Sequence, residues 1–186
     1  MPLLPREPDI YPANLLEPGE NSPEPGRKWL AFYTLARREK DLARRLAALR
    51  VPFYAPLVKR RVKSPGGRTR ESFVPLFPGY VFARVDDDQR RLTLATNTIA
   101  RWLPVGDETV LLDDLRSIKR LIDAGVPLTP EARLETGHRV RVRSGPFLGL
   151  EGTVVERRGR QRLLVTVRFL NQGVSIELED VELEPR

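Results

Sequence analysis

The side chains best suited to chemistry in this 186-residue chain are cations. The stretch from Arg37 to Arg70 contains 12 lysines and arginines but only two acidic residues, Glu39 and Asp41. Such a dense positive field attracts phosphate backbones, and it costs self-repulsion when no anion is nearby. The pattern indicates electrostatic binding of nucleic acid, with a solvated basic surface that binds nothing as the alternative.

Groups that enzymes use are scarce in this chain. His138 is the only histidine and cysteine is absent, which removes cysteine nucleophiles, thiolate metal sites and disulfides. The run from Asp86 to Asp88 is typical of a helix cap, because three consecutive carboxylates do not converge on one cation. We therefore expect no enzymatic activity, no metal site and no cofactor.

The composition also bounds where the protein acts. No apolar run approaches the roughly 20 residues that a membrane-spanning helix needs, and the start of the chain lacks the apolar centre of a signal peptide. We expect a cytoplasmic monomer that does not bind membranes.

The stretch from Gly137 to Val155 specifies a compact β-structure. Val140 and Val142 alternate with arginines, which sends valines to a buried face, and Gly145-Pro146 ends the strand in a tight turn. Two further β-rich runs, 162–169 and 174–178, follow. The sequence predicts a small SH3-like β-barrel over 137–186, joined by a linker over 126–136.

A second domain is predicted upstream. Seven prolines within residues 1–27 and few large apolar groups predict a disordered tail there. The sequence of residues 28–125 predicts strands that alternate with helices. The first strand is predicted at 29–35, the first helix at 37–50 and another helix starting at Asp113 or Asp114. This order predicts an α+β fold, with an antiparallel sheet covered by helices.

Two motifs in this upstream domain carry a resemblance. The segment 29–34 followed by Arg37-Arg38-Glu39-Lys40, and the segment Pro75-Leu76-Phe77-Pro78-Gly79-Tyr80-Val81-Phe82, resemble the amino-terminal domain of the NusG family of transcription elongation and antitermination factors. The stretch 137–155 resembles the KOW motif of elongation factors and some ribosomal proteins. The resemblance implies a non-enzymatic factor that binds RNA polymerase.

The resemblance also implies which residues make contacts. Residues matched to the apolar surface that takes the tip of the polymerase clamp are Tyr33, Phe77, Pro78 and Tyr80. Ordinary core packing is the alternative for these positions, and it is favoured for Tyr80.

Basic residues of the first helix match positions near the non-template DNA strand of the transcription bubble. These are Arg37, Arg38 and Lys40, extended along the helix by Arg44 and Arg45. A basic hairpin adds Lys59, Arg60, Arg61, Lys63, Arg68 and Arg70, which could reach upstream DNA or a second lobe of the polymerase.

In the predicted barrel, Phe147 matches an exposed aromatic residue that contacts ribosomal protein S10 or the termination factor Rho. A side chain that plugs the barrel is the alternative. The proline-rich residues 1–27, which we call the leader, favour a specialised RfaH-like paralogue, as do the dense hairpin and Pro75-Leu76-Phe77-Pro78. Arg91-Leu92-Thr93-Leu94, however, matches the gate-loop motif of RfaH poorly. The competing function is a KOW-type RNA-binding or ribosome-associated protein.

Overall fold

The computed structural model describes residues 7–19, 25–63, 67, 69–131, 137–178 and 182–186. By their internal contacts, these residues form two compact units that divide after Glu108. The sequence instead places a linker at 126–136, and the predicted domain limits stay a prediction. The α+β fold class is confirmed, with helices and a sheet first and an antiparallel sheet after them.

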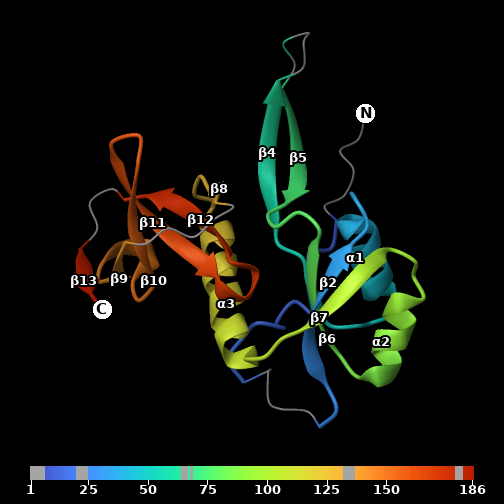
Figure 1. Cartoon of the computed structure of the whole chain (residues 1–186). Coiled ribbons are helices and arrows are strands. Elements are labelled where there is room, and N and C mark those ends of the chain that lie inside the picture. Colours follow the sequence, from blue (N-terminus) through green and yellow to red (C-terminus); the bar gives the residue numbers. More distant parts are fainter. Residues whose placement is uncertain (1–6, 20–24, 64–66, 68, 132–136, 179–181) are drawn as a thin grey trace. The chain divides into compact units, whose positions relative to one another are not determined.

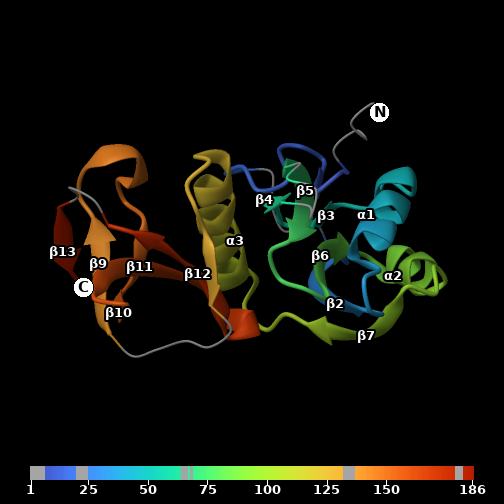
Figure 2. The same ribbon diagram turned by 90° about the horizontal axis from the view of Figure 1, so that it is seen from above.

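The first unit contains a five-stranded antiparallel sheet in the order β1-β3-β6-β2-β7. The strands are β1 (Ile10–Tyr11), β3 (Phe53–Tyr54), β6 (Tyr80–Val85), β2 (Lys28–Thr34) and β7 (Ile99–Pro104). Helices α1 (Glu39–Ala48) and α2 (Asp87–Leu94) lie on the same side of this sheet (Figure 2).

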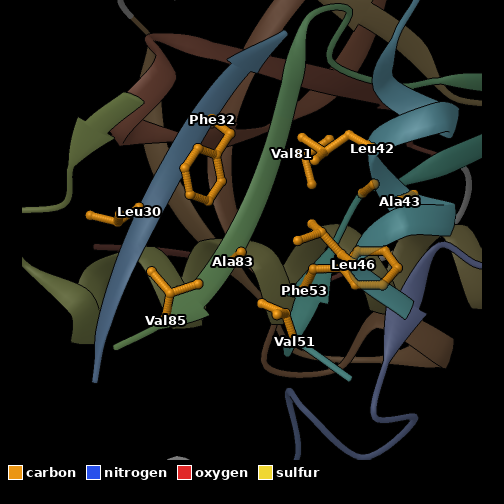
Figure 3. Packing of buried hydrophobic residues seen from close by; sticks show 11 residues of the cluster. Leu30, Phe32, Leu42, Ala43, Leu46, Val51, Phe53, Val81, Ala83 and Val85 are labelled. Atoms are coloured by element: carbon orange, nitrogen blue, oxygen red, sulfur yellow. The ribbon is translucent and has the colours of Figure 1, made fainter. Parts of the chain in front are cut away.

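The core of the first unit lies between α1 and the sheet. Leu42 and Leu46 of α1 point toward Phe32, Phe53 and Val81 on three neighbouring strands (Figure 3), and all five side chains are fully buried. Their spacing of four residues places both leucines on one face of the helix. This packing fixes the start of α1 relative to the ends of β2 and β6.

A separate two-stranded hairpin extends from the first unit (Figure 1). It consists of β4 (Leu57–Lys63) and β5 (Thr69–Pro75), paired from Leu57 with Pro75 to Lys63 with Thr69. The predicted hairpin is thereby confirmed. Pro56 separates β3 from β4, because proline has no amide hydrogen to give to a sheet.

Part of the leader has a defined structure. Strand β1 pairs with β3, placing Ile10 opposite Tyr54, and the side chains of Leu15 and Leu16 are buried. The prediction of disorder is wrong for residues 7–19, because two adjacent leucines and an open sheet edge outweigh the effect of the prolines. Residues 1–6 and 20–24 lie outside the described residues.

The second unit contains helix α3 and a six-stranded antiparallel sheet in the order β13-β9-β10-β11-β12-β8. Helix α3 spans Glu108–Asp123. The strands are β8 (Thr129–Glu131), β9 (His138–Val142), β10 (Glu151–Arg157), β11 (Arg160–Val167), β12 (Gln172–Glu177) and β13 (Leu183–Pro185). The short turns η1 (Gly145–Phe147) and η2 (Arg168–Leu170) connect strands. We call this sheet the C-terminal sheet.

Helix α3 begins earlier than the sequence predicts. It starts at Glu108 rather than at Asp113 or Asp114, because Leu111 continues the apolar spacing of Leu115 and Ile118 by one further turn. Among the residues that the structure describes, no helix is long and apolar enough to cross a membrane.

Candidate functional site

The turn between β5 and β6 is tied to both neighbouring elements. Gly79 adopts a φ of 87°, and its amide donates to Glu39 Oε1 at 2.7 Å. Its carbonyl accepts a hydrogen bond of 2.8 Å from the amide of Thr34 at the end of β2. The turn, the end of β2 and the start of α1 therefore form one structural site.

Two tyrosines and an arginine gather beside this turn. The rings of Tyr33 and Tyr80 lie 5.1 Å apart with an interplanar angle of 63°, an edge-to-face arrangement. The Arg101 guanidinium carbon lies 4.9 Å from the centre of the Tyr33 ring. We call Tyr33, Tyr80 and Arg101 the tyrosine cluster, and both of its rings are partly exposed.

The other two predicted polymerase-binding residues differ in exposure. Pro78 is exposed, whereas the Phe77 side chain is only 2% exposed and belongs to the core. A side chain buried to this degree stabilises the turn by excluding water from its apolar surface. Of the four predicted residues, Tyr33, Pro78 and Tyr80 present surface to solvent and Phe77 does not, and polymerase contact through any of them stays a prediction.

The cations of α1 surround one carboxylate. Arg38 Nη1 lies 2.8 Å from Asp41 Oδ2, and Arg45 Nε lies 3.1 Å from Asp41 Oδ1. Arg44 lies 3.7 Å from the same carboxylate and 2.6 Å from Glu7 of the leader. Because only two carboxylates, Asp41 and Glu7, pair with these three guanidiniums, this face of the helix stays positive.

The electrostatics of Asp41 follow from these contacts. The hydrogen bond from Arg45, with the further one from Arg38, lowers the pKa of the Asp41 carboxyl below its ordinary value of 3.8. The charged form is therefore the one that the helix stabilises.

Arg37 and Lys40 complete the predicted basic helix. Arg37 precedes α1, is exposed and has a left-handed φ of 61°, and Lys40 is partly buried. The structure thus brings all five predicted cations of this region to the start and the outer face of α1.

The hairpin presents cations on both faces. Lys59 and Arg61 lie two residues apart on β4 and so share a face. Both pair with Glu71 of the partner strand, at 2.7 and 2.9 Å. The hydrogen bond from Lys59, followed by that from Arg61, lowers the pKa of Glu71 below 4.5. Arg60 points to the opposite face and makes no ion pair among the described residues.

The remaining hairpin predictions fall at its tip. Arg68 lies outside the described residues, and so do the side chains of Lys63 and Arg70, whose backbones belong to β4 and β5.

In the second unit, Phe147 is only 9% exposed and lies in η1. It lines a pocket of about 530 Å³ together with Val142, Leu163 and Ile176. The neighbouring Leu148 is 57% exposed, so the apolar surface of this turn belongs mainly to Leu148. The family resemblance indicated Phe147 as the contact residue, but it did not single out Leu148.

Helix α3 holds this turn by its backbone. The Arg120 guanidinium donates to the carbonyls of Pro146 and Leu148 at 2.9 and 2.8 Å. Sequence reasoning missed Arg120, and it also missed Glu39 as the acceptor for Gly79 and Arg101 as the partner of Tyr33. Only the presence of Glu39 within a basic run gave a local signal for any of these.

Residues 27–122, more than half of the chain, match the family model described as transcription termination factor nusG. The chain belongs to the NusG family. It is thus a non-enzymatic transcription termination/antitermination factor, and NusG membership implies interaction with RNA polymerase.

Individual relatives carry the same description. The chain is 28% identical over 178 residues to the transcription termination/antitermination protein NusG of Thermus thermophilus, covering 83% of this chain and 97% of that protein. The NusG of Deinococcus radiodurans is 27% identical over 181 residues, with 82% and 95% covered. That of Vibrio cholerae is 28% identical over 130 residues, with 66% and 71% covered.

Proposed function

We propose that this NusG-family factor binds the clamp of RNA polymerase through Tyr33, Pro78 and Tyr80, and holds the non-template DNA strand with the cations of α1. The cations of the hairpin reach upstream DNA or a second lobe of the polymerase. One observation carries the proposal. Glu39 lies among the basic residues that open α1, and it accepts the amide hydrogen of Gly79 in the turn beside Tyr80. The two predicted binding regions are therefore adjacent.

The physical properties of each region suit its proposed partner. The tyrosine rings offer a large apolar area with few rotatable bonds, so binding costs little side-chain entropy. The cations of α1 outnumber their carboxylate partners, and such contacts bind single strands without regard to sequence.

Clamp binding is tested by pull-down with RNA polymerase. We expect the double variant Tyr33→Ala, Tyr80→Ala to weaken retention of the polymerase by roughly tenfold or more, as for residues at the centre of an interface. Trp102→Ala is the matched control, because Trp102 is 38% exposed. It is paired with Phe32 across the two strands, so both side chains point to the face of the sheet opposite Tyr33. Equal losses in both variants, or none in the tyrosine variant, would refute the proposed surface.

DNA contact is tested by the salt dependence of binding to an artificial transcription bubble. Arg38→Ala should lower the slope of log Kd against log salt concentration by about 0.7, the value for one phosphate contact on a single strand. Arg91→Ala is the control, since Arg91 is an exposed helix arginine that also pairs with an aspartate three residues away. Identical slopes for wild type and Arg38→Ala would count against the contact.

The second unit is proposed to recruit another protein through the turn that contains Phe147 and Leu148. The relevant probes are ribosomal protein S10 and Rho, the partners implied by the resemblance. Leu148→Ala should weaken capture of the partner while leaving polymerase retention unchanged. Enrichment of the full chain on ribosomal subunits without polymerase would instead favour the ribosome-associated alternative.

A further inference from the structure

Four arginines gather at one end of the C-terminal sheet, next to the pocket of Phe147, which Arg162 also lines. Arg157, Arg158, Arg160 and Arg162 lie at the hairpin of β10 and β11 and line an open pocket of about 600 Å³. We call them the guanidinium cluster. We propose that it is a second nucleic-acid site, which binds the phosphodiester backbone of a single strand.

The strand register places three of these arginines on one face. Arg157 is paired with Arg160, and Arg162 is paired with Glu177 of β12. Because residues two apart on a strand share a face, Arg160 and Arg162 point to the same side, about 7 Å apart along β11. Glu156 and Gln161 are paired with each other one position away and point to the opposite side.

The interior part of the cluster is held in place by a hydrogen-bond network. Arg162 donates to the hydroxyl of Ser175 at 2.8 Å, and this buried hydroxyl donates to Glu131 Oε1 at 2.7 Å. Arg162 also donates to the Thr129 hydroxyl, and Arg157 lies 3.3 Å from Glu131. These contacts order the two inner guanidiniums before any ligand binds, which lowers the entropic cost of binding.

The charges in the pocket do not balance. Glu177 lies 3.1 Å from both Arg160 and Arg162, so one carboxylate serves two guanidiniums. Counting only residues that the structure describes, the pocket is lined by four arginines and two glutamates, an excess of two positive charges. Among the described residues, Arg158 makes no hydrogen bond or ion pair through its side chain.

The backbone at Arg158 points to a role beyond folding. Arg158 and Gly159 form the two-residue turn of the hairpin, with φ values of 52° and 74°. Turns of this kind favour asparagine or aspartate followed by glycine, because both residues need a left-handed φ. An arginine here strains the backbone and leaves an exposed cation at the hairpin tip, where it is available to an anionic ligand.

The chemistry of the lining favours a nucleic-acid backbone. Guanidinium groups bind phosphate through two parallel hydrogen bonds, and a strand presents them at regular intervals to a regularly charged polymer. The pocket is lined by no aromatic side chain, so bases have no surface on which to stack. Since the chain belongs to a family of transcription factors, the polymer with regular phosphates is nucleic acid.

The test uses the full chain and fluorescence anisotropy with a 20-nucleotide oligouridine RNA and an oligothymidine DNA of the same length. The variant Arg158→Asn, Arg160→Gln removes the two outer cations, and asparagine suits the left-handed φ of the turn. We expect roughly tenfold weaker binding to both strands, and a salt slope lower by about 1.4 if two phosphate contacts are lost. The thermal melting temperature should stay the same or rise.

The matched control is Arg143→Gln, Arg186→Gln, which removes the same charge from exposed arginines that directly follow β9 and β13 of the C-terminal sheet. This variant should keep the wild-type salt slope. Equal losses in the two variants, or an unchanged slope in the Arg158 and Arg160 variant, would overturn the proposal. A loss confined to RNA would support it and assign the site to the transcript.

A third variant separates this site from the proposed function of the first unit. Arg38→Gln, Arg44→Gln should lower the slope independently, and its effect should add to that of the Arg158 and Arg160 variant. If α1 does not bind nucleic acid, the α1 variant keeps the wild-type slope while the variant of the guanidinium cluster still loses affinity. Binding of an acidic peptide in place of both nucleic acids would contradict the proposal.

Discussion

At the residue scale, Gly79 is the position where backbone conformation and a functional side chain depend on each other. A Cβ atom at this position would lie 2.7 Å from Cε2 of Tyr33, closer than van der Waals contact permits. The φ of 87° also requires a conformation that side-chain-bearing residues rarely adopt. Glycine therefore allows the Tyr33 ring to lie directly over the turn.

We predict that Gly79→Ala destabilises the first unit by about 2 kcal/mol or more, from the left-handed backbone and the contact with Tyr33. Urea denaturation followed by circular dichroism measures the change. Gly106→Ala is the control, because Gly106 has open space around it and no strained φ, and its effect should be small. Equal stability of wild type and Gly79→Ala would show that the turn rearranges freely.

The lowered pKa of Asp41 predicts how the free energy of unfolding changes with pH. Its pKa is lowered in the folded protein, chiefly by the hydrogen bond from Arg45, so its contribution to stability is present above 3.8 and is lost as pH falls through the lower folded value. The free energy of unfolding of wild type should therefore exceed that of Asp41→Asn near neutral pH, and the difference should shrink below pH 3.8. A difference that grows on acidification would contradict this assignment.

At the element scale, helix α2 shows how a local signal becomes a stabilising contact. Asp86 accepts a hydrogen bond of 2.7 Å from the amide of Gln89, and the Gln89 side chain accepts one from the amide of Asp86. This reciprocal arrangement satisfies two donors that the first turn of a helix would otherwise leave unpaired. The predicted cap is confirmed.

Asp86→Ala should lower the free energy of unfolding by about 1 kcal/mol, the usual cost of losing an N-cap. Asp88→Ala, two residues further on, is the control, since the Asp88 side chain is highly exposed and should be replaceable with little effect. Chemical denaturation distinguishes the two. Equal effects would show that charge near the helix start, rather than the cap itself, stabilises α2.

The leader is the element for which composition misleads. Residues 7–19 are rich in proline, yet Leu15 and Leu16 are buried and Ile10 pairs with Tyr54. We predict that Leu15→Ala destabilises the first unit by about 2 kcal/mol or more, as is usual for a buried leucine. Leu35→Ala should change stability little, because Leu35 is about half exposed. A neutral Leu15→Ala in thermal or urea unfolding would show that the leader is dispensable.

At the scale of the whole molecule, the stability of each of the two units has to be measured separately. In the second unit, the buried carboxylate of Asp114 accepts hydrogen bonds from the amide, Nε and Nη2 of Arg168. Together with Arg120 on the Pro146 and Leu148 carbonyls, this contact ties α3 to the connections of the C-terminal sheet.

The double variant Asp114→Ala, Arg120→Ala should accelerate amide hydrogen exchange in α3 by roughly tenfold or more, since hydrogen bonds to charged groups stabilise by about 1.5 kcal/mol or more. Exchange in β2 and β6 should not change. The control Asp113→Ala, Lys119→Ala removes exposed charges of the same helix. Equal acceleration in the control would mean that helix propensity, rather than these contacts, governs opening.

Short-range sequence patterns were sufficient to predict many elements of this protein. The alternation of Val140 and Val142 predicted a strand that is present as β9, and the helix predicted at 37–50 is present as α1. The basic run predicted a positive helix and hairpin because formal charge does not depend on folding. Each of these features depends on neighbours within a few residues, so a single sequence records it.

Tertiary structure decided which of these features meet. The hydrogen bond between Gly79 and Glu39 spans 40 positions, and that between Arg168 and Asp114 spans 54. The burial of Phe77 and Phe147, the exposure of Leu148 and the gathering of four arginines around two glutamates likewise depend on strand pairing. Such contacts arise from packing between distant segments, whose energies no local pattern of residue types expresses.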